Sequence, residues 1–262
     1  MFDIHYHLLF GLDDGPKTIE DALGLAEASI AEGVTHIVAT PHANSRYPFL
    51  PEMNRERLAI LQERLGDRLT LGLGCDFHLS YENIEDLSKN PSKYTINGKQ
   101  YLLVEFPDFG ISQNMSNVFF EMRVAGVIPV ITHPERNPTL VAEPNRMAEW
   151  IASGYLVQIT AASLTGRFGS KAQATALDLV KKNWVHIVAS DAHSMNGRPP
   201  LLRGAHALIS ERFGVETADR LCIENPRAVF LGEHLPAQPE PVGIHEDASA
   251  SRGGFWNRLF RR

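Results

Sequence analysis

The sequence predicts an α/β fold in which seven parallel strands form a closed or nearly closed barrel. Seven short apolar runs alternate with stretches of helical pattern along the 262 residues. Three of these runs, at residues 32–42, 125–135 and 182–193, resemble one another, because each is rich in β-branched residues and reaches Thr or Ser before a His. Apolar runs without strict alternation are typical of strands buried on both faces of a parallel sheet. Seven such units favour a barrel over an open sheet.

These patterns place the elements in chain order. The opening run, "FDIHYH", is followed by the clearest helix, from Thr18 to Glu32, whose apolar residues recur at i, i+3, i+4, i+7 and i+11. Thr18 and Asp21 resemble a capping box, and Gly33 stands where a glycine often follows a helix. The other predicted strands lie in residues 32–42, 69–76, 101–106, 125–135, 154–160 and 182–193.

Composition restricts the class of protein. With 44% apolar residues the chain can bury a large core, and 262 residues suit a single barrel domain. The formal net charge of −6 implies no basic surface of the kind that binds nucleic acid. The sequence holds no run of 18 apolar residues and no signal-peptide pattern, so we expect a soluble, cytoplasmic protein. Cys75 and Cys222 are too few for a disulfide framework or a thiolate zinc site.

Acidic or imidazole side chains stand at six of the seven predicted strand ends, and barrel enzymes carry their active sites at the C-terminal ends of the strands. His5 and His7 share one face of the first strand, because residues i and i+2 point the same way. Charges that converge at one mouth repel one another unless a cation lies among them. We therefore predict a metal cluster with nine candidate ligands: His5, His7, Asp14, His42, Asp76, Glu105, His133, Asp191 and His193.

The predicted ligands indicate the chemistry. Histidines and carboxylates without thiolate suit ions such as Mn²⁺, Fe²⁺ or Zn²⁺, and nine groups suit two or three ions. Closely spaced divalent ions activate water and clamp the oxygens of an in-line displacement, which favours phosphoester hydrolysis. Arg136 and Arg198 follow His133 and His193 by three and five residues, and a guanidinium there can grip a phosphate. The alternative for each arginine is an ordinary surface position in a loop.

Several motifs together resemble a known family. They are "DIHYHLLFGLDDGPKTIEDAL", "THIVATPH", "VEF", "THPERN", "SDAHSMNGRPP" and "ENPRAVFLG". In order and spacing they are similar to the PHP (polymerase and histidinol phosphatase) superfamily. Within it they resemble the metal-dependent protein-tyrosine phosphatases of bacterial capsule and exopolysaccharide operons. The resemblance covers residues 1–233 and implies a distorted (β/α)7 TIM-like barrel with a three-metal centre.

The resemblance also implies roles for individual residues. His5, His7, Glu105 and Asp191 would hold one ion, Glu105, Asp76 and His133 the second, and Asp14, His42 and His193 the third. Arg136 and Arg198 match the phosphate-binding arginines, and with Asp14 and His42 they form the expected catalytic set. Asp76 stands where the family usually has a glutamate. The shorter side chain puts one metal site in doubt, and His78 is the residue placed to compensate.

The resemblance implies a cofactor and a partner as well. The cofactor is manganese, with Fe, Zn, Co and Mg as alternatives. The substrate is phosphotyrosine on the tail of a membrane tyrosine autokinase that regulates polysaccharide synthesis. A cysteine-based tyrosine phosphatase would need the pattern C-x5-R, but Tyr81 and Ala228 stand six residues after the two cysteines. Phosphotyrosine hydrolysis here therefore requires metal-activated water, and the phenolate, whose pKa is about 10, leaves without a strong general acid.

Two other functions stay open. The same site can act on a small phosphate ester such as histidinol phosphate, or on a nucleic-acid 3′ end, although the acidic composition argues against nucleic acid. A protein of another class, a non-catalytic regulator, would use the metals as structural staples and bind the kinase tail. Two arginines beside the predicted ligands weigh against it, because a staple needs no phosphate grip.

Several features of the sequence lie outside the predicted metal cluster. Residues 43–58 follow His42, and their Arg46, Tyr47 and Phe49 form either a lip for a peptide or an ordinary loop. We interpret the other histidines as structural (His36, His186) or as surface residues (His206, His234, His245). Residues 234–262 are predicted to be a tail, with a flexible linker at 236–254. Its last eight residues, "FWNRLFRR", suit a disordered basic end or a contact with a membrane or partner.

Overall fold

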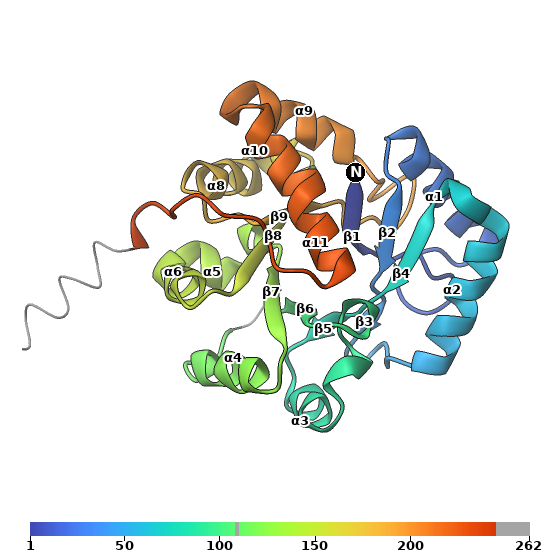
Figure 1. The fold of residues 1–262 in the computed structure, drawn as a ribbon, viewed down its shortest axis with the longest axis horizontal. Helices are drawn as coiled ribbons and strands as arrows, with labels where there is room; N and C mark the ends of the chain where they lie inside the picture. The colour runs from blue at the N-terminus through green and yellow to red at the C-terminus, as the bar shows by residue number, and fades with distance from the viewer. Residues whose placement is uncertain (108–109, 245–262) are drawn as a thin grey trace, which may run out of the picture.

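A core of parallel strands surrounded by helices makes up the computed structural model, which describes residues 1–107 and 110–244 (Figure 1). One sheet has the order β1-β2-β4 and the other the order β3-β5-β6-β7-β8-β9, and every pairing between these strands is parallel. The first sheet comprises β1 (Phe2–Tyr6), β2 (His36–Ala39) and β4 (Thr70–Leu73). The second comprises β3 (His42–Ala43), β5 (Asp76–His78), β6 (Tyr101–Glu105), β7 (Ile128–Thr132), β8 (Leu156–Thr160) and β9 (Ile187–Ala189).

The seven predicted strands give nine because two of the runs are broken in the middle. The run at 32–42 contains β2 and β3, separated by Thr40 and Pro41. Pro41 has no N–H to give to a ladder, and the Thr40 hydroxyl accepts the Tyr6 N–H at 2.9 Å. The run at 69–76 gives β4 and β5, separated at Gly74, where a Cβ would lie 3.0 Å from Ile96 Cγ1. Each break moves the second half of its strand from one sheet to the other.

The first and last strands lie side by side. The Asp191 N–H donates to the His5 carbonyl at 2.9 Å, and the His7 N–H donates to the Ala192 carbonyl at 3.0 Å. Tyr6 and Ala192 form a parallel bridge. The chain just beyond β9 is therefore hydrogen-bonded to the end of β1, which brings together residues almost 190 positions apart in sequence.

Helices cover the outside of the strands (Figure 1). The predicted first helix is observed as α1 (Ile19–Ala31), with Thr18 at its N-cap accepting the Asp21 N–H at 3.2 Å and Gly33 beyond its end at φ +86°. The later helices are α2 (Pro51–Leu65), α3 (Tyr81–Lys89), α4 (Met115–Val124), α5 (Pro138–Ala142), α6 (Pro144–Ala152), α7 (Ala161–Leu164), α8 (Gly169–Lys181), α9 (Leu202–Phe213), α10 (Val215–Asp219) and α11 (Asn225–Leu231).

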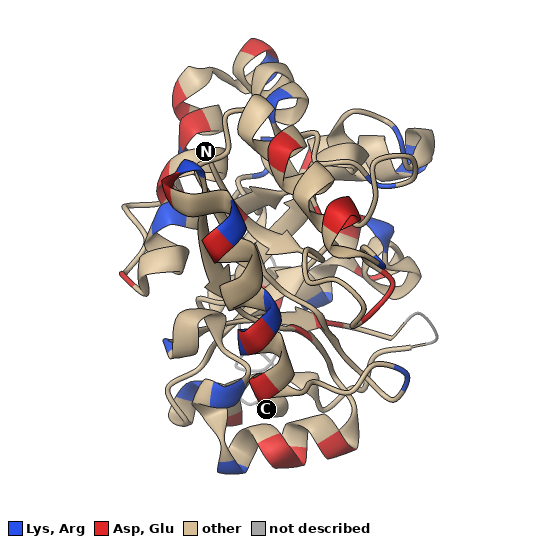
Figure 2. Cartoon of the chain, turned by 90° about the vertical axis from the view of Figure 1, so that its right-hand side faces the viewer, with Lys and Arg blue, Asp and Glu red and all other residues tan. Residues whose placement is uncertain are grey.

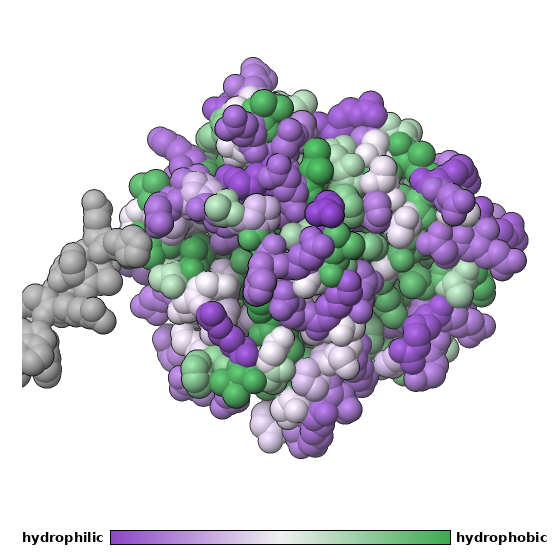
Figure 3. All heavy atoms as spheres, in the orientation of Figure 1, coloured by the Kyte–Doolittle hydropathy of each residue, from purple (hydrophilic) through white to green (hydrophobic). Residues whose placement is uncertain are grey.

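The core between helices and strands is apolar and closely packed. Phe106, at the end of β6, stacks on Trp150 of α6 at 5.3 Å between ring centroids, and Phe119 of α4 meets Trp150 edge-on. Charges of both signs occur on the outer helices (Figure 2). Hydrophilic residues cover much of the face shown in Figure 3, with hydrophobic residues between them. Among the described residues, every helix falls short of the length and hydrophobicity that crossing a bilayer requires.

The first part of the predicted flexible linker is held against the domain. The Val242 N–H donates to the Lys182 carbonyl at 2.8 Å, and the Trp184 indole N–H donates to the Val242 carbonyl at 2.9 Å. The Gln238 side chain exchanges hydrogen bonds with Asn225, and Ile244 is buried. Residues 245–262, with His245 and the "FWNRLFRR" segment, lie outside the described residues.

Two histidines predicted to be structural lie within the scaffold. His36 stacks on Phe2, with 4.1 Å between ring centroids. His186 is buried, and its Nδ1 accepts the Val157 N–H at 3.1 Å. Burial lowers the pKa of His186 from 6.5 to about 4, so the folded protein holds this imidazole neutral.

We expect His186 to make folding stability depend on pH. Between pH 6.5 and 4 the unfolded chain binds a proton at this position that the folded chain does not, so the free energy of unfolding falls as the pH falls. The full effect is about 3 kcal/mol. Urea unfolding at pH 7.5 and pH 5 should show a loss about 2 kcal/mol larger for the native chain than for His186→Asn, whose amide oxygen can still accept the Val157 N–H. An equal loss in both chains would contradict the assignment.

Candidate metal centre

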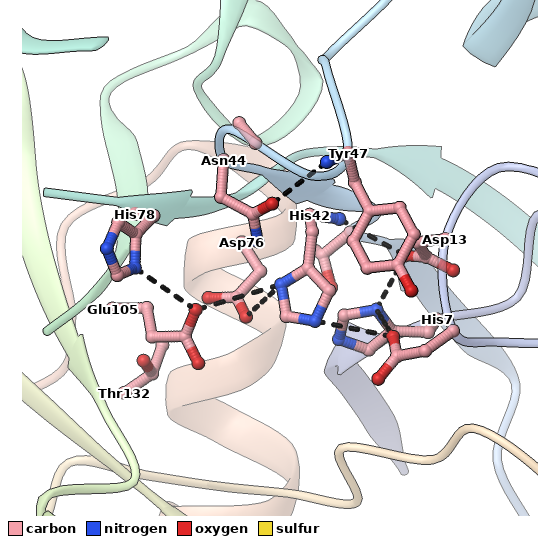
Figure 4. A network of polar contacts seen from close by, with 12 residues as sticks. His7, Asp13, His42, Asn44, Tyr47, Asp76, His78, Glu105 and Thr132 are labelled. Carbon is pink, nitrogen blue, oxygen red and sulfur yellow. Dashed lines mark hydrogen bonds and ion pairs between the residues drawn. The ribbon is translucent and has the colours of Figure 1, made fainter. Parts of the chain in front are cut away.

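The predicted ligands converge at the C-terminal ends of the strands. His5 lies within β1, His42 within β3 and Asp76 within β5, and all three side chains point toward one centre. Figure 4 shows His42 between Asp76 and Glu105 on one side and His7 on the other. The His42 Nδ1 atom lies 3.2 Å from Asp76 Oδ2 and 3.7 Å from Glu105 Oε2. Strands far apart in sequence thus supply one polar cluster.

All nine candidates belong to groups whose ligand atoms lie within 4.8 Å of one another. The groups are His7, Asp14, His42 and His193; His5, His7 and Asp76; His5, His133 and Asp191; and His42, Asp76 and Glu105. The first of these contains the whole set that the resemblance assigns to the third ion, with His7 added. Glu105 is grouped with His42 and Asp76 rather than with His5, His7 and Asp191, although its Oε1 lies 3.7 Å from His133 Nε2.

Unpartnered buried atoms show that these residues suit a cation. Asp76 is 1% exposed, yet neither of its carboxylate oxygens has a hydrogen-bond partner among the described residues. The same holds for His5 Nε2, His7 Nε2 and His42 Nδ1. Buried polar atoms without partners cost free energy, and divalent cations coordinated by imidazole nitrogen and carboxylate oxygen would satisfy them. The residues present therefore fit a metal cluster, and Asp76, despite its shorter side chain, lies in two of the groups that could hold an ion.

Two of the candidate ligands have strained backbones. His133 has φ +34° and Asp191 has φ +55°, a left-handed conformation that non-glycine residues seldom adopt. Both stand just beyond the end of a strand, β7 and β9, where the chain turns away from the core. Strain of this kind persists where the surroundings fix it, and it gathers at functional sites.

The ionisation of the cluster follows from its crowding. Burial opposes the charged form of His5, but Asp191 and Asp76 more than offset it and raise the pKa of His5 to about 9. In the same way Asp14 and Asp76 raise the pKa of His42 to about 11. Burial and the neighbouring His193 lower the pKa of His7 to about 4. Imidazoles must be neutral to bind a metal, so metal binding releases the protons of His5 and His42.

The structure adds two residues that sequence reasoning missed. Asp13 is buried, and its Oδ2 lies 2.7 Å from His7 Nδ1 and accepts the His42 N–H at 3.1 Å. Gln158, in the one strand predicted to carry no ligand, places its Oε1 2.9 Å from His5 Nδ1. Such contacts fix the orientation of a metal-binding imidazole. The adjacent pair in "DDGP" was the available signal for Asp13, whereas nothing in the sequence pointed to Gln158.

Gly15 makes the Asp13 contact possible. Its N–H donates to Asp13 Oδ1 at 2.9 Å, and a Cβ at this position would lie 2.6 Å from the backbone oxygen of His7. We expect Gly15→Ala to displace the loop that orients His7 and to weaken metal binding about tenfold, within the range of losses known for residues that orient metal ligands. A competition assay with a fluorescent chelator measures the affinity. Gly204→Ala, whose Cβ position lies in ordinary contact at 3.7 Å from Thr165 Cγ2, is the control, and equal affinities in both variants would contradict the prediction.

Both predicted arginines reach the cluster through Asp191. The Arg136 Nη2 atom donates to Asp191 Oδ2 at 2.5 Å, and Arg198 Nη2 donates to the same oxygen. Burial opposes the charge of Asp191, but His5 and the two guanidiniums hold its pKa well below its usual range. The Nε atoms of Arg136 and Arg198 are buried and have no partner among the described residues. Each arginine therefore keeps a donor for another acceptor.

A cavity of about 280 Å³ joins the arginines to the cluster. Its lining comprises Asp14, His42, Asp76, Glu105, Phe106, Thr132, His133, Arg136, Asn137, Asp191 and Arg198. Phe168, beside this cavity, lies against the Arg136 guanidinium, with 4.5 Å from Cζ to the ring centroid. The lining thus brings two guanidiniums next to carboxylates and imidazoles, which suits an anionic group held beside cations.

Other predicted residues lie around this cavity or away from it. Tyr47 stacks on His42 at 5.9 Å, so it stands at the site, whereas Phe49, expected in the same lip, is buried against Tyr94. The His78 Nδ1 atom lies 3.7 Å from Glu105 Oε2, outside the groups that could hold an ion. The predicted surface residue His206 contacts Asp219 at 2.7 Å. Among the described residues, Cys75 and Cys222 are buried free thiols.

Comparison with known proteins identifies the family. Residues 1–231 match the family described as "Capsular polysaccharide synthesis, CpsB/CapC". The chain belongs to the CpsB/CapC family. CapC of Staphylococcus aureus is 40% identical over 209 residues, which are 78% of this chain and 81% of the relative. The tyrosine-protein phosphatase YwqE of Bacillus subtilis is 34% identical over 247 residues, 92% of this chain and 96% of the relative.

A solved structure agrees with this CpsB/CapC assignment. It is one of a set of crystal structures of YwqE from Bacillus subtilis and CpsB from Streptococcus pneumoniae, which are described as metal-dependent tyrosine phosphatases. It matches with a TM-score of 0.86 at 33% identity and covers 92% of this chain and 99% of its own. The family expected from the sequence motifs is thereby confirmed, and the metal-binding geometry described above lies in a CpsB/CapC fold.

Proposed function

We propose that this protein is a metal-dependent protein-tyrosine phosphatase. The observation that carries the proposal is the meeting of Arg136 and Arg198 with a cluster of unpartnered buried imidazole and carboxylate atoms in one cavity. The relatives named as tyrosine-protein phosphatases support it. We also propose that the strands close into a distorted (β/α)7 barrel, which the hydrogen bonds between β1 and the chain beyond β9 support.

The residues of this chain divide into three roles. His5, His7, Asp14, His42, Asp76, Glu105, His133, Asp191 and His193 would hold the ions. Bound divalent ions supply activation of water and polarisation of the phosphoryl oxygens. Arg136 and Arg198 bind the phosphoryl group, with the Nε donors that the structure leaves free. Asp14 and His42 complete the proposed catalytic set; Asp14 is 46% exposed and lies 3.4 Å from both His42 Nε2 and His193 Nε2, which lower its pKa and keep it ionised.

The finer parts of the proposal concern the metal and the partner. Two or three ions, with manganese as the first choice, suit a set of imidazoles and carboxylates without thiolates. The proposed substrate is a phosphotyrosine protein, specifically the tail of a membrane tyrosine autokinase that regulates polysaccharide synthesis. Membership of a family described by its part in capsular polysaccharide synthesis supports this choice of substrate. The proposed location is the cytoplasm. The two buried free thiols are compatible with its reducing conditions.

A substrate comparison tests the proposed function. The manganese-loaded protein is assayed on a phosphotyrosine peptide, on the matching phosphoserine peptide and on histidinol phosphate. The proposal predicts that kcat/KM is highest for phosphotyrosine. A higher value for histidinol phosphate would keep the chemistry and reject the substrate. Binding of the phosphotyrosine peptide without turnover of any of the three would favour a non-catalytic regulator.

A further inference from the structure

A second cavity opens beside the metal centre. It has a volume of about 460 Å³ and shares Asp14 with the first cavity, and His193 also lines it. Its other walls come from residues 15–17, from the face of α1 that carries Glu20 and Gly24, and from residues 194–196. The metal centre and this groove therefore lie on either side of Asp14.

A glycine inside α1 keeps the groove open. Gly24 stands in the middle of α1 with a helical φ, so no left-handed turn requires it. A Cβ at this position would meet nothing within 4 Å, so no neighbouring atom requires it either. Glycine inside a helix is unfavourable relative to alanine, and one use for it is the close approach of a ligand to the backbone. Gly24 lies in the wall of the groove, where a ligand can make that approach.

An exposed methionine also lines the groove. Met195 is 51% exposed and lies in the turn between His193 and Arg198, which backbone hydrogen bonds from His193 and Ser194 to the Arg198 carbonyl hold in place. Pro16 and Leu25 complete the apolar lining. Methionine packs adaptably against aliphatic and aromatic groups.

Two charged residues of the groove, Lys17 and Asp21, have local hydrogen-bond partners, whereas Glu20 is exposed. The Lys17 ammonium donates to the Asp13 carbonyl at 2.6 Å, and the Asp21 carboxylate accepts the Thr18 hydroxyl at 2.9 Å. Both contacts hold the chain at the start of α1. The apolar part of the lining is therefore the stretch that holds Gly24, Met195 and Pro16.

We propose that this groove binds the substrate polypeptide next to the phosphotyrosine and prefers an apolar or aromatic side chain there. The inference rests on the proposed function, since it supplies the peptide part of the same substrate. The phosphate enters the first cavity, and the flanking residue lies over Gly24 against Met195. Selectivity for sequence then comes from this groove, while turnover of the phosphate comes from the metal centre and the arginines.

Paired substrates and a matched glycine variant test this inference. The manganese-loaded full chain is assayed on p-nitrophenyl phosphate and on phosphotyrosine peptides that carry Leu or Ser two residues before or two residues after the phosphotyrosine. We expect at least a fivefold higher kcat/KM for Leu on one of the two sides. Gly24→Gln fills the groove with a better helix former, so the variant should fold and lose the preference for Leu. Met195→Ser should lose it too.

The control is Gly204→Gln on α9, an exposed helical glycine outside this groove whose Cβ position lies 3.7 Å from Thr165 Cγ2. It should keep the native preference, and all variants should hydrolyse p-nitrophenyl phosphate within twofold of the native chain. A Leu preference that is absent, or that survives both groove variants, would overturn the inference while leaving the phosphatase function intact. If the native chain hydrolyses neither p-nitrophenyl phosphate nor the peptides, the proposed function fails and the inference fails with it.

Discussion

Replacement of Asp191 by asparagine is expected to lower kcat/KM for a phosphotyrosine peptide on the order of 1000-fold, about 4 kcal/mol in transition-state stabilisation. Asp191 is 1% exposed and lies between two sets of partners. Its Oδ1 faces His5 Nε2 at 3.5 Å and His7 Nε2 at 3.7 Å, while its Oδ2 accepts hydrogen bonds from both arginines. Loss of its charge weakens a proposed metal ligand and also leaves two guanidiniums without their buried counter-ion, which is costly.

The asparagine variant is the informative one because it preserves shape. Asparagine tolerates the φ of +55° at this position better than most residues do, so the fold should survive. Metal content after dialysis should fall together with activity. Asp178→Asn, which removes a carboxylate from an exposed ion pair with Lys182 on α8, is the control and should stay within twofold of the native rate. Full activity with full metal content in Asp191→Asn would refute the assignment of this ligand.

Replacement of Arg198 by alanine is expected to lower kcat/KM about 100-fold, a typical loss for one charged donor to a transition state. Arg198 contacts Asp191 and His193, but Asp191 keeps its hydrogen bond from Arg136 in this variant, so we expect metal content to match that of the native protein. Inorganic phosphate should inhibit the variant at least tenfold more weakly, because Arg198 is assigned to the phosphoryl group and not to the metal. Arg136→Ala should behave in the same way.

Arg167→Ala provides the matched control. Arg167 is exposed and stands next to Phe168, so this variant removes a guanidinium near the site without touching the cavity lining. Its kinetics and its inhibition by phosphate should be native. An Arg198→Ala variant with native inhibition by phosphate would show that Arg198 only neutralises Asp191.

The sequence was most informative where spacing alone determines geometry. His5 and His7 alternate on one strand, and a parallel arrangement brings the ends of neighbouring strands to one edge, so convergence of the nine candidates could be expected. The capping residues of α1 could also be predicted from the sequence, because a local side-chain contact defines them. These features depend on a few adjacent residues or on strand direction, which sequence patterns record well.

Features that depend on packing between residues far apart in the chain could not be predicted from the sequence. Asp13 and Asp14 are chemically identical neighbours, and only the turn at Gly15 decides that Asp13 is buried against His7 while Asp14 is half-exposed. Phe49 is buried because Tyr94, 45 positions away in sequence, covers it. The breaks at Pro41 and Gly74 divide two strands between sheets, which apolar runs do not reveal. The contacts of Gln238 and Val242 hold a segment whose composition is that of a linker.

The most direct measurement is the hydrolysis of a phosphotyrosine peptide by one preparation in three states: as purified, after removal of metal by a chelator, and after addition of manganese to the chelated and dialysed protein. We expect activity to disappear on chelation and to return with manganese, while circular dichroism shows that the fold is kept. Phosphotyrosine hydrolysis that continues at the same rate in metal-free protein would contradict a phosphatase built on this cluster.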